Sequence, residues 1–275
     1  MCKLNNILET LEFLILLGYY YFEAFVLLIC PLCKKNVAGE IVLITGAANG
    51  IGMQIALNFA RLGATLVFWY IDEEGNKETT KLAKENGTKG VYAYRCDCSN
   101  REEVYRVADQ TCKAFLPAMI ACNRVYLVSI SSGTGLIGAN KLTDYNASKF
   151  AIIGFLESLA FELQAAGKKG IKTTIIRPSF INTEVSTGIR VSRPLLFPIL
   201  DVEYAGRKIV DAIREEKFYV FMPLTNCLSS LKNFVSKKVL LLAVEYAGIF
   251  NNLDGVRDRK TRDQNHTALK MSDTS

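Results

Sequence analysis

Residues 41–52 read IVLITGAANGIG, a short β-branched run that opens directly into a glycine-rich turn. The helical pattern after the turn continues through Leu62, and a glycine then ends it. This order of strand, glycine turn and helix is typical of dinucleotide-binding units. Gly46 permits the tight turn, Gly50 lets the backbone approach a pyrophosphate, and Gly52 allows close helix packing. The candidate cofactor-binding residues of this turn are Gly46, Asn49, Gly50, Ile51 and Gly52.

Two further strands are expected in the same half of the chain. The first, from Ala64 to Ile71, ends beside Asp72, a carboxylate suited to bond the ribose hydroxyls of an adenosine. The second, Val91 to Tyr94, leads into Asp97, which is placed to lie beside the adenine. An alternative that can coexist with this role is a helix N-terminus there, with Ser99 as the cap and Glu102 at the third helical position.

The second half of the chain begins with a strand that ends in serines, RVYLVSISSG, residues 124–133. Thirteen residues after Ser132 comes Tyr145, and Lys149 follows it by four positions within YNASK. If Tyr145 starts the long helix that continues to Gln164, this spacing puts phenol and ammonium on one face. A neighbouring ammonium favours tyrosinate and lets a phenol act as acid or base nearer neutral pH. Ser132 is then expected to donate a hydrogen bond to the substrate oxygen.

Composition excludes several other classes of function. The 275 residues carry a net charge of +6, but basic and acidic residues are scattered, without the basic, aromatic-rich helix expected for nucleic-acid binding. His266 is the only histidine and lies in a polar tail, which argues against Ser-His-Asp hydrolysis and His-ligated metals. The eight cysteines show no disulfide framework, and the one CxxC match, Cys30 to Cys33, lies in an apolar run without a second pair, so we expect reduced thiols and no metal site.

The N-terminal residues 1–36 are interpreted as a membrane anchor. Phe13 to Cys33 is a run of 21 residues whose one charge is Glu23, close to the roughly 20 residues that span a bilayer. Because a central glutamate is costly in a bilayer, a monotopic anchor lying in one leaflet is favoured over a spanning helix. A buried core helix is the remaining alternative. Residues 37–253 are assigned to the catalytic domain and 254–275 to a disordered polar tail.

The motifs TGAANGIG, CDCSN, SISS, YNASK and RPSFINT resemble those of the short-chain dehydrogenases/reductases over residues 39–254. The apolar leader, with AGEIVLITGA and KAFLPAMIA, resembles the membrane-associated branch of that family, which acts on retinol and steroids. The resemblance implies a Rossmann-like doubly wound parallel sheet, with Ser132, Tyr145 and Lys149 catalytic. It also implies that Thr183 contacts the nicotinamide carboxamide, and that Tyr145 and Lys149 also bind the cofactor.

The resemblance further implies an oxidoreductase that acts on a lipophilic alcohol or ketone. The expected location is the endoplasmic reticulum membrane or a lipid droplet, with the catalytic domain facing the cytosol, and a homodimer is compatible with the family. NAD(H) is favoured because no Arg or Lys stands in the glycine turn or directly after the second strand, and NADP(H) is not excluded. The family branch has an acidic residue where this chain has Tyr70, so ribose recognition falls to Asp72.

A second departure from the family is the absence of its Asn-Asn-Ala-Gly strand and of the helix that follows. Only 28 positions separate Asp97 from Val125, whereas two crossovers and a strand between them require more. We therefore expect that one central strand-helix unit is missing, with the join near residues 110–113. Either the next strand moves about 4.8 Å into the vacant place beside the first strand, or that place stays open. Both outcomes favour the alternative hypothesis of a catalytically silent relative that binds cofactor weakly or not at all.

Overall fold

The computed structural model describes residues 2–29, 33–107, 125–140, 142–168, 170–183, 191, 193–195 and 197–248. The chain divides into two compact units, Met1–Lys35 and Asn36–Ser275, and each is considered by itself. Both the expected tail, 254–275, and the expected join near 110–113 lie outside the described residues.

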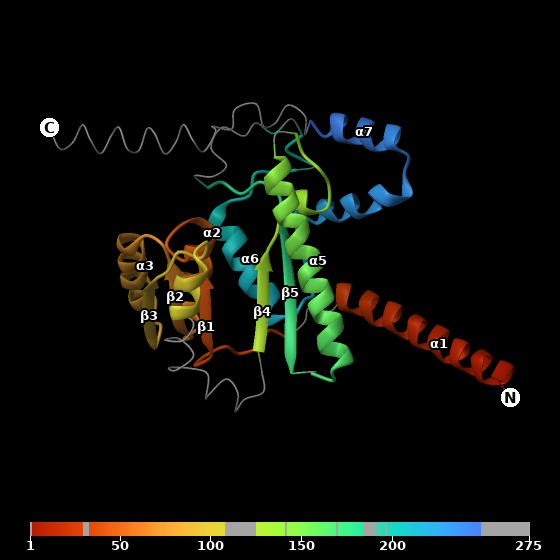
Figure 1. Cartoon of the computed structure of the whole chain (residues 1–275), viewed down its shortest axis with the longest axis horizontal. Helices are drawn as coiled ribbons and strands as arrows, with labels where there is room; N and C mark the ends of the chain where they lie inside the picture. Colours follow the sequence, from red (N-terminus) through yellow and green to blue (C-terminus); the bar gives the residue numbers. More distant parts are fainter. Residues whose placement is uncertain are drawn as a thin grey trace. The chain divides into compact units, whose positions relative to one another are not determined.

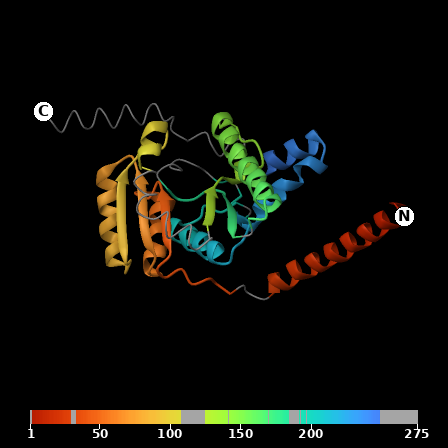
Figure 2. The same ribbon diagram turned by 60° about the horizontal axis from the view of Figure 1, so that its bottom comes forward.

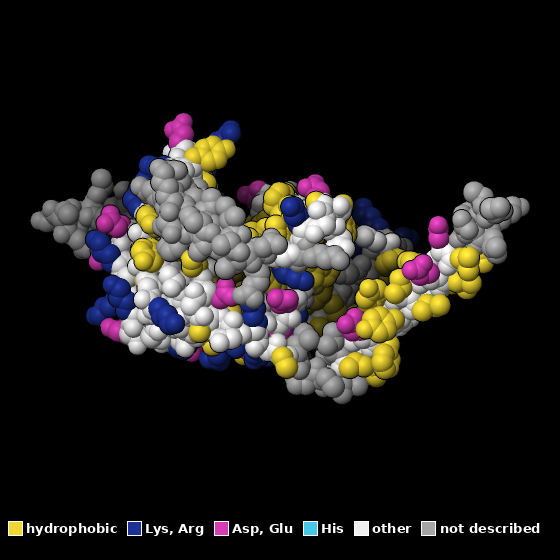
Figure 3. Space-filling view, turned by 90° about the horizontal axis from the view of Figure 1, so that it is seen from below, with side chains coloured by type: hydrophobic (Ala, Val, Ile, Leu, Met, Phe, Trp, Pro, Cys, Tyr) yellow, Lys and Arg dark blue, Asp and Glu magenta, His cyan; other side chains and the backbone are white. Residues whose placement is uncertain are grey.

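The described part of the first unit contains α1 (Cys2–Ile29), an α-helix that continues through Glu23. Its described apolar side chains are exposed, among them Ile15 at 71% and Tyr21 at 72% (Figure 3). Among the helices in the described part of the chain, we find none with the length and apolar character needed to cross a membrane.

The second unit begins with three parallel strands alternating with helices. Its strands are β1 (Ile41–Thr45), β2 (Thr65–Tyr70) and β3 (Gly90–Arg95), hydrogen-bonded in the order β1-β2-β3. The connecting helices are α2 (Gly50–Arg61) and α3 (Glu73–Glu85). A further short helix covers residues 101–107. These elements lie where the hydrophobic patterns predict them, with β2 one residue shorter than expected at each end.

The other half of this unit is a second parallel sheet, which contains β4 (Val125–Ile130), β5 (Ile171–Pro178) and β6 (Tyr219–Met222), in the order β4-β5-β6. Its α-helices are α5 (Thr143–Ala165), α6 (Val202–Arg214) and α7 (Lys237–Tyr246). Two 3₁₀ helices, η1 (Gly133–Gly135) and η3 (Leu224–Phe234), follow β4 and β6.

Helices cover both faces of the strands, so the domain is doubly wound. Side chains alternate between the faces of each strand: Phe68 points to one face of β2 and Val67 to the other, and Ile176 and Ile175 do the same on β5. The first face of both sheets shares one continuous core with α2 and α6. On the other face the core is in two separate parts, one beside residues 101–107 and one under α5.

The two sheets are not joined. In the described part of the chain no hydrogen-bonded ladder links β1 to β4, and the two groups of strands stand apart in both views (Figure 1 and Figure 2). Of the two expected outcomes, the structure therefore has the second: β4 is not paired with β1, and no described strand lies between them. The shared core explains this outcome, because α2 and α6 pack together beneath both sheets and hold β4 away from β1. Leu43 of β1 and Leu127 of β4 remain 44% and 38% exposed.

Helix α5 is fixed to the second sheet by a buried charge. The Arg177 side chain on β5 is only 4% exposed, and its Nη2 lies 3.3 Å from Oε1 of Glu157 on α5. Tyr219 of β6 donates its hydroxyl to the same carboxylate oxygen at 2.6 Å, and the guanidinium lies 4.3 Å from the Tyr219 ring centre. The three side chains thus join α5, β5 and β6.

We expect Glu157→Gln to lower the free energy of unfolding by about 2 kcal/mol, because it leaves Arg177 buried without its anion. The value is below that for fully buried pairs because the Glu157 side chain is 34% exposed. Urea denaturation measures it, and Glu162→Gln, an exposed site on the same helix, serves as the control. Equal stability of the two variants would show that the pair does not hold α5.

The same cluster predicts a loss of stability in alkali. Burial and the hydrogen bond to Glu157 raise the pKa of Tyr219 from its ordinary value of 10.0 to about 12. Since the folded state favours the neutral phenol, this contribution is fully present below pH 10 and is lost as pH rises toward about 12. Unfolding midpoints measured across that interval should fall more steeply for the wild type than for Tyr219→Phe.

Candidate active site

The glycine turn adopts the conformation that its sequence predicts. Gly46 and Gly50 have φ of +72° and +53°, backbone values that other residues rarely adopt. A Cβ placed on Gly52 would overlap the carbonyl of Gly46, so only glycine allows α2 to start this close to the turn. The N–H of Gly46 donates to the carbonyl of Trp69 at 2.9 Å, which fixes the turn beside the end of β2.

A cavity of about 340 Å³ lies between this turn and the segment after β5. It is lined by Asn49, Gly50, Met53, Gln54, Asn182, Thr183 and Val202. A Cβ added to Gly50 would lie 3.5 Å from Cγ2 of Thr183, so the turn and the segment are in close approach. Three candidate cofactor residues, Asn49, Gly50 and Thr183, are thus brought together from elements far apart in the sequence, whereas Ile51 packs against the main core.

The cavity also contains residues that sequence reasoning missed. Asn182 lies next to Thr183 in RPSFINT, and that adjacency was the one signal available for it. Met53, Gln54 and Val202 sit in helical patterns that read as ordinary packing, so nothing in the sequence distinguished them.

Asp72 and Asp97 follow β2 and β3, as expected, but each is engaged in a local turn. Asp72 caps α3 through a hydrogen bond from the Glu74 N–H at 3.1 Å. Oδ1 of Asp97 accepts from the backbone N–H and the hydroxyl of Ser99, at 2.9 and 2.7 Å. These hydrogen bonds lower the pKa of Asp97, so its carboxylate is firmly ionised at neutral pH. Neither aspartate lines the cavity beside the glycine turn.

The expected cap of the next helix is corrected by one position. Asn100, rather than Ser99, accepts from the N–H groups of Glu102 and Glu103, at 3.0 and 3.2 Å. The Ser99 hydroxyl instead donates to Oδ1 of Asp97 at 2.7 Å. Glu103, and not Glu102, then reaches back to the Asp97 N–H at 2.9 Å.

The three candidate catalytic residues come from the end of β4 and the start of α5. Lys149 is half-buried, and its Nζ lies 5.4 Å from the ring centre of Tyr145 and donates to the carbonyl of Ile130 at 3.0 Å. Burial lowers the pKa of the Lys149 ammonium. Tyr145 is 38% exposed. Both residues therefore lie at the strand end that carries Ser132.

Ser132 is 7% exposed and has a structural role here. Its Oγ accepts from the N–H and the hydroxyl of Thr134, at 3.2 and 3.1 Å, and so caps η1. The hydroxyl proton is directed toward the Pro178 carbonyl at 3.4 Å. Donation to a substrate oxygen would require the hydroxyl to rotate away from that long hydrogen bond.

Two neighbours of the candidate catalytic residues hold the site together. Ser131 donates its hydroxyl to the carbonyl of Lys149 at 2.8 Å. Asn146 is 7% exposed and donates to the Ala139 carbonyl at 3.1 Å. These contacts tie the start of α5 to β4 and its loop, and sequence reasoning did not single out either residue.

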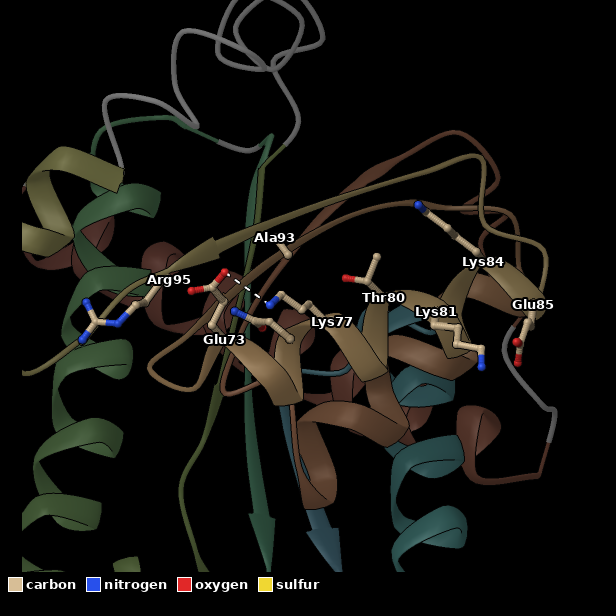
Figure 4. Close-up of a pocket in the computed structure, with 9 residues that line it drawn as sticks. Glu73, Lys77, Thr80, Lys81, Lys84, Glu85, Ala93 and Arg95 are labelled. Atoms are coloured by element: carbon tan, nitrogen blue, oxygen red, sulfur yellow. Dashed lines mark ion pairs between the residues drawn. The ribbon is translucent and has the colours of Figure 1, made fainter. Parts of the chain in front are cut away.

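A larger cavity, about 650 Å³, lies elsewhere, between α3 and β3 (Figure 4). Its lining is Glu73, Asn76, Lys77, Thr80, Lys81, Lys84, Glu85, Ala93 and Arg95. Lys77 already pairs with Glu73 at 3.7 Å. None of the candidate site residues lies there, and the lysines that line it all belong to α3. We therefore place the candidate active site at the glycine turn despite the larger size of this cavity.

Comparison with known proteins identifies the family of the chain. Residues 108–193 match a family model described as short chain dehydrogenase, and residues 46–125 match one described as Enoyl-(Acyl carrier protein) reductase. Epidermal retinol dehydrogenase 2 of Homo sapiens is 44% identical to the chain, over 94% of the chain and 99% of that protein. The chain belongs to the short-chain dehydrogenase/reductase family. Human 17-beta-hydroxysteroid dehydrogenase 13 is 34% identical over 86% of the chain and 92% of that protein, which confirms the expected branch.

The fold agrees with solved members of the short-chain dehydrogenase/reductase family. A short chain dehydrogenase/reductase from Burkholderia phymatum, solved in complex with NAD, superposes with a TM-score of 0.62. It is 21% identical and covers 81% of this chain and 99% of that chain. The expected Rossmann-like architecture is confirmed.

Alignment lengths bear on the missing unit. The alignment with human epidermal retinol dehydrogenase 2 has 305 positions but takes in 94% of 275 residues, about 258, so about 47 positions have no residue of this chain. The same arithmetic for human 17-beta-hydroxysteroid dehydrogenase 13, with 280 positions and 86%, gives about 44. A strand with its crossover helix fits within such a length. The shortfall agrees with the open place between β1 and β4.

Proposed function

We propose that the chain is a nicotinamide-dependent oxidoreductase of lipophilic alcohols and ketones of the retinol or steroid class. The observation that carries the proposal is that Tyr145 and Lys149 lie together at the end of β4 while a cavity joins the glycine turn to Thr183. The named functions of the relatives, retinol and 17-beta-hydroxysteroid dehydrogenases, support the substrate class.

The glycine turn fits a dinucleotide. Gly52 lets α2 start close against the turn, and Asn49, Gly50 and Thr183 line the cavity that a dinucleotide would enter. Asp72 would serve the ribose with the carboxylate oxygen that does not cap α3. We favour NAD(H) over NADP(H), because a carboxylate there repels a 2′-phosphate. When bound, the nicotinamide accepts the hydride in alcohol oxidation and supplies it in ketone reduction.

The chain's own residues would handle the proton. In oxidation, the Tyr145 oxygen takes the proton of the substrate hydroxyl, and in reduction it returns that proton to the carbonyl oxygen. Lys149 holds a positive charge near the phenol and would also bind the ribose. Ser132 would orient the substrate oxygen once its hydroxyl turns from Pro178. For hydride transfer, these residues must lie at the correct distance from a cofactor bound at the glycine turn. Because the place between β1 and β4 is open, no pairing among the described strands fixes that distance.

We also propose that residues 1–36 form a monotopic membrane anchor. The exposed apolar surface of α1 supports it, as does the Lys34-Lys35 pair that favours a cytosolic position for residues 37–253. The endoplasmic reticulum membrane or a lipid droplet is the proposed location, with residues 254–275 as a polar tail. A homodimer is compatible with this arrangement.

NADH titration of the Trp69 emission tests cofactor binding. Trp69 is buried at the end of β2, and its carbonyl accepts from Gly46, so a bound dinucleotide should quench it in a saturable way. We expect Gly52→Ala to weaken binding at least about tenfold, since its Cβ displaces the turn. Gly154→Ala is the matched control, because a Cβ there meets nothing within 4 Å. Wild-type protein with no quenching and no thermal stabilisation by NADH would refute the proposal.

The broken sheet favours a second candidate function, that of a catalytically silent relative. The named relatives are dehydrogenases and do not favour it. The titration separates the two candidates when it is combined with turnover of retinol. Binding with turnover supports the enzyme, whereas binding without turnover supports a silent relative.

A further inference from the structure

Two consecutive helices near the end of the described chain expose apolar stripes. On η3 the stripe is Leu228, Leu231 and Phe234, spaced by three residues, and a 3₁₀ helix has three residues per turn. On α7 it is Val239, Leu242 and Tyr246, spaced by three and four, which is one face of an α-helix. Phe234 is 85% exposed and Leu242 is 67% exposed. We call these six residues the C-terminal apolar surface.

The opposite sides of these helices are fixed to the domain. Asn226 of η3 is 2% exposed and donates to the carbonyls of Arg177 and Met222, at 3.3 and 3.2 Å. At the end of α7, Val244 and Ala247 are buried. These buried contacts fix η3 and α7 to the domain with the apolar stripes facing solvent. The stripes are therefore not the core-facing sides of detached helices.

The charges around the surface are mostly positive. Residues 224–246 contain Lys232, Lys237 and Lys238 but one acid, Glu245. Lys237 and Lys238 are exposed at the start of α7, directly between the two stripes. Apolar side chains beside exposed lysines are the combination by which a peripheral protein binds an anionic lipid surface.

We propose that the C-terminal apolar surface binds an anionic lipid bilayer, with Phe234 and Leu242 in the acyl region and Lys237 and Lys238 at the headgroups. None of the six residues lines the cofactor cavity, so the site does not depend on catalysis. A large exposed apolar patch on a protein marks an interaction site, and the positive charge selects anionic lipid over a second copy of this equally basic surface.

The test uses the full chain and vesicles whose acyl chains carry bromine, which quenches tryptophan on contact. Phe234→Trp and, independently, Leu242→Trp place a reporter in the surface, and the Trp69 signal of the wild type is subtracted. Phe155→Trp on α5 is the control, because that phenylalanine is 67% exposed but lies outside the surface. Binding through α1 alone would bring all three variants to the vesicle without quenching the two surface reporters.

We expect quenching of both surface reporters and not of the control, rising with phosphatidylserine content. Lys237→Gln combined with Lys238→Gln should weaken this docking about tenfold or more, while Lys81→Gln with Lys84→Gln on α3 leaves it unchanged. Vesicle-bound protein with unquenched surface reporters would overturn the proposal, as would equal quenching of the control. If the emission of the surface tryptophans shifts to the blue with rising protein concentration in the absence of vesicles, the surface binds a second copy of the chain, and the proposal is overturned.

Discussion

Replacing Tyr145 by phenylalanine is expected to lower retinol turnover by about 10²- to 10⁴-fold while NADH affinity stays unchanged. That range is the usual contribution of a positioned acid or base, and phenylalanine removes only the oxygen that exchanges the proton. The ring itself, 38% exposed and beside Lys149, keeps its packing. Steady-state turnover together with the Trp69 titration measures both parts of the prediction.

A second tyrosine on another helix gives a matched control. Tyr204 on α6 is 42% exposed, and Lys208, four residues later, lies with its Nζ 5.7 Å from the ring centre. The Tyr145 and Lys149 pair has the same spacing and a distance of 5.4 Å. If acid/base catalysis depends on the position of Tyr145 at the end of β4, Tyr204→Phe should leave turnover unchanged. Equal losses in the two variants, or normal turnover in Tyr145→Phe, would refute the assigned role.

This pair also shows what the sequence could establish. A tyrosine and a lysine four residues apart on a helix are common, and Tyr204 with Lys208 repeats the spacing without the strand end that makes it useful. Tyr145 was distinguishable because Ser132 precedes it by thirteen residues and a glycine turn occurs earlier in the chain. Those signals are local, and the structure keeps them, because Lys149 reaches the Ile130 carbonyl at the end of β4.

Local competition for hydrogen bonds was harder to predict. Ser99 and Asn100 are both good helix caps, and in the structure Asn100 is the cap while the Ser99 hydroxyl donates to Asp97. Ser132 likewise has two uses, and in the structure its oxygen caps η1. Sequence spacing gives the position of such a side chain along the chain but not which of several nearby donors and acceptors it will choose.

The position of β4 relative to β1 could be predicted only as one of two outcomes, a strand that moves beside β1 or a place that stays open. The short interval between Asp97 and Val125 indicated a missing strand, but whether β4 would move beside β1 depended on packing beneath the sheets. Ile44 and Phe68 of the first sheet and Ile176 of the second share one core with α2 and α6. Closing the open place would require that shared core to be repacked, and interiors resist such changes in volume and shape.

Restoring the missing unit is expected to raise turnover at least about 100-fold. In the proposed chimera, residues 108–124 are replaced by the corresponding segment of human epidermal retinol dehydrogenase 2, which we expect to be longer and to supply a strand and a helix. A strand paired with both β1 and β4 would fix the distance between the glycine turn and the end of β4. Without such a strand no ladder among the described strands fixes this distance, and misplacement by about 1 Å can cost a factor of 100 in rate.

The control for the chimera is a Gly/Ser linker of equal length at the same site, which adds residues without a strand. Hydrogen exchange provides a second measurement, because amides of β1 and β4 facing the open place should exchange rapidly in the native chain and slowly in the chimera. Leu43 and Leu127, now 44% and 38% exposed, should become buried at the same time. A chimera with protected β1 amides but no gain in turnover over the linker would mean that the open place does not limit activity.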